Sequence, residues 1–145
     1  MINIICVGKI KEKYLTDMNN DYYQRVNKYH KVNIIELKDS NIKEEGDLIL
    51  KQLESHKGFI VTMEIEGNNN TSLDLSKNID SWLMNYANIN FIIGGSDGID
   101  ERVKSLSNYK LSFGKNTFPH GVFRALLLEQ IYRSFKILNN ESYHK

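Results

Sequence analysis

The chain has 145 residues with a formal net charge of +1, and 41% of its residues are hydrophobic, which supports a core of ordinary size and argues against disorder. Its single cysteine, Cys6, excludes an internal disulfide framework and a cysteine-based zinc ribbon or finger. No apolar stretch approaches the roughly 20 residues of a membrane span, and the start of the chain does not resemble a signal peptide. We therefore expect one soluble, cytoplasmic domain over residues 1–145 that binds no membrane.

Strand and helix patterns alternate from the start of the chain. The β-branched apolar run Ile2–Val7 predicts a buried strand, and we expect Cys6 to be a small core residue within it. Apolar residues at spacings of three and four between Leu15 and Val26 predict a helix. The next strand is predicted over Val32–Leu37 and the next helix over Ile42–Leu53.

The same alternation continues to the end of the chain. It predicts a strand over Phe59–Ile65, a polar turn over Gly67–Thr71, and then a helix with Ser72 as its N-cap. A strand over Ile89–Ile93 and a short helix over about Asp100–Leu106 follow. The last two predicted elements are a strand over about Tyr109–Phe113 and a long helix over about Pro119–Leu138. Strands and helices at this spacing form βαβ units, so the predicted fold class is α/β, with a mostly parallel sheet and helices on both faces.

Ligands of open α/β sheets bind beyond the carboxyl ends of the strands, which directs attention to three segments. These segments are Met63–Gly67, the G-G-x-x-G sequence at Gly94–Gly98, and Gly114–His120. The glycines permit close approach to a flat ligand, although a tight turn alone would also explain them. Pro119 is suited to a helix start. The four histidines lack a second histidine at i+3 or i+4, so we expect no metal site.

Charge is distributed unevenly along the chain. Residues 1–100 carry 11 Lys and Arg against 15 Asp and Glu, whereas residues 101–145 carry 8 against 3, a balance of +5. A basic third is consistent with a polyanionic partner such as RNA, and chance clustering on a solvated surface is an equal alternative.

Six motifs in order resemble one family over the whole chain. They are VGKIKEKY, MEIEG, FIIGGSDG, LSFGKNTFPH, RALLLEQIYR and the C-terminal YHK, and together they are similar to the RlmH family of SPOUT-class RNA methyltransferases. The resemblance implies methylation of N3 of a pseudouridine in 23S rRNA of the large ribosomal subunit, with S-adenosylmethionine as the methyl donor. It also implies a homodimer and a C-terminal trefoil knot, which general rules of chain topology would not predict.

The resemblance places cofactor contacts on three segments. Met63 stands where the family usually has leucine, a change that preserves volume and apolar character. Gly114 and Asn116 stand where serine and methionine are common, which is tolerable if this loop binds the cofactor through its backbone. The expected cofactor-binding residues are Met63, Gly94, Phe113, Gly114, Lys115, Asn116, Thr117 and Phe118.

The reaction also requires groups that act on the substrate. The N3–H of a uracil-type ring is weakly acidic, so a neutral histidine or a cation is needed as N3 loses its proton. Among the candidates in the last third, the resemblance favours Tyr143 and His144 as catalytic residues. Arg124 is the third expected catalytic residue, because it lies about one turn into the last helix, beside the expected cofactor loop. His120 and Arg133 are further candidates, although Arg133 could simply pair with Glu129. The alternative is a non-catalytic α/β ligand-binding or ribosome-associated factor.

The expected homodimer requires an interface. The apolar cluster Ala125–Leu128 and Ile131 in the last helix is the expected contact with the second subunit.

Overall fold

A computed structural model describes all 145 residues and contains one five-stranded sheet in which every pairing is parallel. The strand order is β2-β1-β4-β3-β5, with β1 at Ile2–Val7, β2 at Val32–Leu37, β3 at Phe59–Asn69, β4 at Ile89–Ile93 and β5 at Tyr109–Ser112. The predicted parallel α/β sheet is therefore confirmed. The trefoil knot expected from the resemblance stays a prediction.

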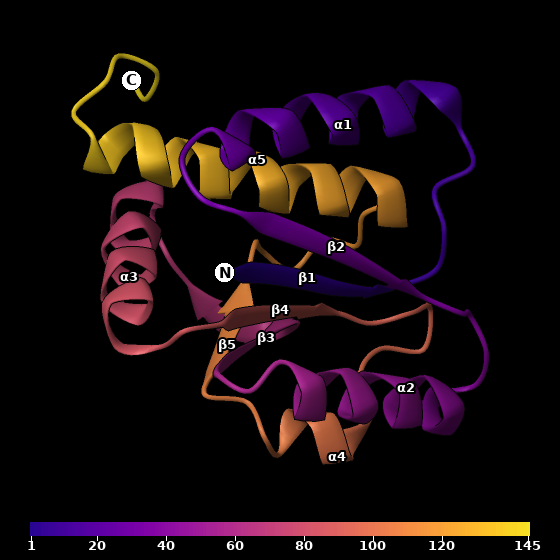
Figure 1. Ribbon diagram of the computed structural model, residues 1–145. Helices are drawn as coiled ribbons and strands as arrows, with labels where there is room; N and C mark the ends of the chain where they lie inside the picture. Colours follow the sequence, from indigo (N-terminus) through magenta and orange to yellow (C-terminus); the bar gives the residue numbers. More distant parts are fainter.

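Five helices cover both faces of the sheet (Figure 1). They are α1 (Lys13–Asn27), α2 (Ile42–Ser55), α3 (Ser72–Asn85), α4 (Glu101–Lys104) and α5 (His120–Leu138). One buried cluster joins α1, α3 and α5 to one face, and a second joins α2 and α4 to the other. None of these helices has the length and apolar character needed to span a bilayer.

Strand β3 is longer than its sequence pattern predicts. Met63 pairs with Leu111 of β5, the register then shifts, and Asn68 pairs with the same Leu111. The predicted turn at Gly67–Thr71 is therefore partly strand, because pairing with β5 resumes beyond the irregularity. The N-cap of α3 is Thr71 rather than the predicted Ser72, and its side chain accepts a hydrogen bond from the Asp74 N–H at 3.1 Å.

The apolar cluster of α5 lies inside the protein's own core. Ala125, Leu127, Leu128 and Ile131 are all 0% exposed in the single chain. For these four residues the expected contact with a second subunit is therefore wrong, because α5 packs against α1 and α3 within the chain. Leu126, the fifth residue of the cluster, is half-buried, and its contact with a second subunit stays a prediction.

Cys6 is a core residue, as predicted, and its chemistry can be tested. Its side chain is fully buried in β1, and burial raises the pKa of the thiol to about 11. At pH 8 only roughly 0.1% of the thiol is then ionised, and the thiolate is the reactive form. We expect a disulfide reagent to leave Cys6 unmodified in the native protein and to modify it rapidly in urea. Equal rates under both conditions would contradict the buried placement.

Candidate active site

A cleft of about 1410 Å³ lies at the carboxyl ends of four parallel strands. One side, which we call the β1–β2 wall, consists of Val7–Lys9, Lys11 and Glu36–Asp39, at the ends of β1 and β2. The opposite side, the β3–β4 wall, consists of Met63–Glu66, Ile93–Ser96, Gly98 and Ile99. The cleft is completed by the chain that enters α5. Its location agrees with the general rule for open α/β sheets.

The glycine turn after β4 needs glycine at its first position. A Cβ atom on Gly94 would lie 2.6 Å from the carbonyl oxygen of Gly98 and 2.8 Å from the side chain of Ile99. The turn closes with a hydrogen bond from the Gly98 N–H to the Gly95 carbonyl at 3.0 Å. A side chain at position 94 would therefore collide with the turn itself before it reached a ligand in the cleft.

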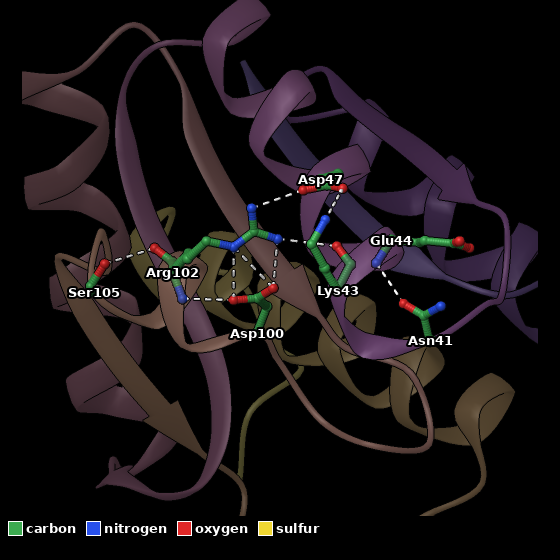
Figure 2. A network of polar contacts seen from close by, with 7 residues as sticks. All are labelled: Asn41, Lys43, Glu44, Asp47, Asp100, Arg102 and Ser105. Atoms are coloured by element: carbon green, nitrogen blue, oxygen red, sulfur yellow. Dashed lines mark hydrogen bonds and ion pairs between the residues drawn. The ribbon is translucent and has the colours of Figure 1, made fainter.

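A polar network attaches α4, which follows this turn, to α2 (Figure 2). Arg102 of α4 lies 2.8 Å from Asp47 of α2 and 2.8 Å from Asp100, and it donates to the carbonyl of Lys43 at 3.1 Å. Asp100 also caps α4 by accepting from the Arg102 N–H at 2.8 Å. This network fixes the far end of the β4–α4 connection, and so helps to hold the glycine turn in place.

The segment between β5 and α5 contributes backbone to the cleft. Asn116, Thr117 and Phe118 line it, together with the predicted Met63 and Gly94. The backbone groups of residues 115–118 form no hydrogen bond within the chain, so they are free to bind a ligand. This arrangement fits binding through the backbone and explains how Asn116 can replace a larger side chain.

Three other predicted cofactor residues do not line the cleft. Phe113 packs on Phe123, with ring centroids 5.6 Å apart, and Lys115 is exposed. Gly114 has a φ of 113°, a conformation that serine adopts only with strain. The loop of this chain therefore has a backbone conformation at position 114 that favours glycine.

Arg124 lies behind the β1–β2 wall rather than in the cleft. Its side chain is 5% exposed and lies 2.9 Å from the carboxylate of Glu36. Its Nη2 atom donates to the Gly8 carbonyl at 3.3 Å and to Nε2 of His120 at 3.0 Å. His120 itself lines the cleft. This geometry gives Arg124 a positioning role for Gly8 and His120, and its catalytic role stays a prediction.

The C-terminal tail forms a second polar cluster with α5. The Tyr143 hydroxyl donates to Glu129 at 2.9 Å, and its ring packs edge-on against Tyr132. Arg133 lies 3.0 Å from Glu129, stands over the Tyr143 ring, and donates to Nδ1 of His144 at 3.1 Å. Burial and the hydrogen bond to Glu129 raise the pKa of Tyr143. The tyrosine therefore stays protonated at neutral pH.

The tail cluster and the cleft lie apart in one chain. His120 and Arg133 are 13 positions apart on α5, a distance of about 20 Å along the helix. In Figure 1 the C-terminal tail extends from the end of α5, and this end of the helix lies next to α3. The start of α5, which borders the cleft, is at the opposite end of the helix. The structure therefore brings Tyr143 and His144 together with each other, and it does not bring them to the cofactor residues of the same chain.

The basic third does not form a free basic face. Five of its eight cations are paired with carboxylates: Arg102, Lys104, Arg124, Arg133 and Lys136. Several of the partner carboxylates, such as Asp47, Glu64 and Glu36, come from the acidic part of the chain. Folding thus neutralises much of the charge asymmetry that the sequence displays.

Comparison with known proteins identifies the class. A family model described as a predicted SPOUT methyltransferase matches residues 1–144, so the chain belongs to the SPOUT methyltransferase family. Proteins named ribosomal RNA large subunit methyltransferase H are 47% identical in Clostridium tetani (strain Massachusetts / E88) and 45% identical in Clostridium botulinum (strain Alaska E43 / Type E3). Each alignment covers 99% of both chains. The resemblance seen in the six motifs is confirmed.

A solved structure supports the fold. A protein described as a probable methylase family protein from Haemophilus influenzae Rd KW20 superposes with a TM-score of 0.63 at 9% identity, and the match covers 99% of this chain and 70% of the other. At this identity the similarity concerns the fold alone.

Proposed function

We propose that the chain methylates N3 of a pseudouridine in 23S rRNA of the large ribosomal subunit, with S-adenosylmethionine as the donor. The observation that carries this proposal is the identity of 45–47% over 99% of both chains with proteins named for rRNA methylation. A ribosomal substrate implies action in the cytoplasm. The proposal requires no metal.

The cleft fits S-adenosylmethionine, which would supply a methyl group on a cationic sulfur. Apolar side chains of the β3–β4 wall, Met63 and Ile93, offer a surface for the adenine ring. Free N–H and C=O groups of residues 115–118 offer partners for its polar edge. Fixing the donor beside an acceptor supplies much of the rate, because methyl transfer is an in-line substitution.

The tail offers hydrogen-bond donors to the target ring. Arg133 can only donate, so Nδ1 of His144 accepts and the neutral imidazole carries its proton on Nε2. The Tyr143 hydroxyl is also protonated, because its pKa is raised, and its single proton, which it donates to Glu129 in the free chain, would be redirected to the ring. As N3 loses its proton to solvent water, negative charge spreads onto the ring carbonyl oxygens, where such donors stabilise it. We propose that the tail acts in this way and that Tyr143 stacks on the base.

A homodimer would bring the C-terminal tail and the cleft together in one active site. The tail is about 20 Å along α5 from the cleft of its own chain, so a second copy is needed to bring a tail to each cleft. We propose a homodimer in which one subunit binds the cofactor and its partner contributes Tyr143 and His144. A monomer at micromolar concentration in sedimentation analysis would overturn this arrangement.

The activity has a direct assay. Labelled methyl groups should pass from S-adenosylmethionine to ribosomes that lack the modification, and digestion of the 23S rRNA should place the label on N3 of a pseudouridine. Binding of S-adenosylmethionine in calorimetry without any transfer would favour the non-catalytic alternative. Label on a different base would contradict the proposed specificity.

A further inference from the structure

The two walls of the cleft differ in charge. The β3–β4 wall carries Glu64 and Glu66, and the one cation beside it, Lys104, lies 3.8 Å from Glu64 and 3.6 Å from Glu101. This wall also holds Met63 and Gly94, the residues assigned to the cofactor. A phosphate backbone is repelled by the free carboxylate of this wall and finds no unpaired cation on it.

The β1–β2 wall carries unpaired positive charge. Lys9, Lys11 and Lys38 line the cleft, are exposed, and form no ion pair within the chain. Glu36 of this wall is already paired with Arg124. Asp39 is therefore the one acidic side chain of the β1–β2 wall that forms no ion pair. Three free lysines that converge on one cleft from two different strand ends form a surface suited to phosphate groups.

We propose that the rRNA lies along the β1–β2 wall, with its phosphates on Lys9, Lys11 and Lys38, and that the target base enters the cleft toward His120. This inference rests on the proposed function and adds to it the face from which the substrate approaches. Cofactor and RNA then occupy opposite walls, with the methyl group between them.

His120 lies on the path of the entering base. Its Nε2 accepts from Arg124, which can only donate, so the neutral ring carries its proton on Nδ1. That Nδ1 has no partner within the chain, while the residue lines the cleft. Burial, reinforced by the charge of Arg124, lowers the pKa of His120 and keeps the ring neutral. The free N–H is placed to donate to a carbonyl oxygen beside N3 of the target ring.

The test compares two triple variants with equal loss of charge. The first, Lys9→Gln with Lys11→Gln and Lys38→Gln, removes the cleft lysines. The control, Lys51→Gln with Lys57→Gln and Lys77→Gln, removes three exposed lysines outside the cleft that form no ion pair.

Methyl transfer is measured against ribosome concentration at several salt concentrations, and binding to ribosomes is measured separately by co-sedimentation. We expect the cleft variant to raise KM for ribosomes roughly 10-fold or more and to reduce the slope of log KM against log salt by about 2, as expected for three phosphate contacts. Its affinity for S-adenosylmethionine should change less than 2-fold. The control should change KM less than 2-fold.

Three results would overturn the proposal: an unchanged KM in the cleft variant, equal effects in both triple variants, or a loss of cofactor affinity in the cleft variant.

For His120, we expect His120→Ala to lower kcat roughly 10-fold with KM unchanged, and His120→Asn to recover part of the loss through its amide N–H. An unchanged kcat in His120→Ala would remove the donor role. If the wild-type chain transfers no methyl group, the proposed function fails, and co-sedimentation with ribosomes still tests the lysine wall.

Discussion

A variant with both Tyr143→Ala and His144→Ala is expected to transfer methyl groups to ribosomes at least roughly 100-fold more slowly than the wild type, the cost of removing well-placed donors to a developing anion. Its affinity for S-adenosylmethionine should stay within 2-fold, because neither side chain lines the cleft of its own chain and the proposed contacts of the tail in the dimer are with the target base. The comparison needs labelled transfer at saturating cofactor and calorimetry on the same preparations.

The tail also packs against its own chain, so a structural effect must be separated from a chemical one. Tyr143→Phe keeps the ring that packs on Tyr132 and removes only the hydroxyl that donates to Glu129. We expect this variant to unfold within about 5 °C of the wild-type temperature, the cost of one lost hydrogen bond, and to lose part of the rate. Wild-type rates in both Tyr143→Ala and His144→Ala would mean that the tail has no catalytic role.

Gly94→Val is expected to weaken S-adenosylmethionine binding roughly 100-fold or more, which corresponds to about 2.8 kcal/mol. A Cβ atom at this position meets the Gly98 backbone at 2.6 Å, and backbone cannot move aside as a flexible side chain can. The glycine turn that lines the cleft must therefore deform. Calorimetry below the unfolding temperature of the variant measures the effect.

A second glycine offers a matched control. A Cβ atom on Gly58 would lie 2.1 Å from the Asn88 carbonyl oxygen, a similar backbone clash at the start of β3 and outside the cleft. Gly58→Val should lower the unfolding temperature and leave cofactor affinity within 3-fold while the protein is folded. Undiminished binding in Gly94→Val, or equal weakening in both variants, would contradict the placement of the cofactor at the glycine turn.

Local patterns were sufficient for much of the fold. The bounds of β1, β2 and β4 agree with the sequence prediction, because each is a short apolar run with polar residues or glycine around it. The extension of β3 could not be predicted in this way. It depends on the second pairing of Asn68 with Leu111, more than 40 positions along the chain, and the intervening residues look like a turn when read alone.

The candidate site was predictable only in part, because some of its contacts join residues that are far apart in the sequence. Met63 lies within β3 and Gly94 directly follows β4, and because these two strands are adjacent and parallel, sheet topology brings both residues to the same cleft. The burial of Arg124 against Glu36 joins residues 88 positions apart and has no local signature. Lys9 and Lys38 follow different strands, and only the parallel β1–β2 pairing makes them neighbours in one wall.

Mixing two inactive variants tests the central claim, that each active site combines the cleft of one subunit with the tail of its partner. One variant carries Tyr143→Ala and His144→Ala, and the other carries Gly94→Val. In a mixed dimer, one of the two sites pairs an intact cleft with an intact tail. Subunits mixed, allowed to exchange, and assayed for methyl transfer to ribosomes should therefore recover up to about a quarter of the wild-type rate, since half of the dimers are mixed and each has one working site. A mixture that stays as inactive as its two components, although subunit exchange is demonstrated, would contradict the shared site.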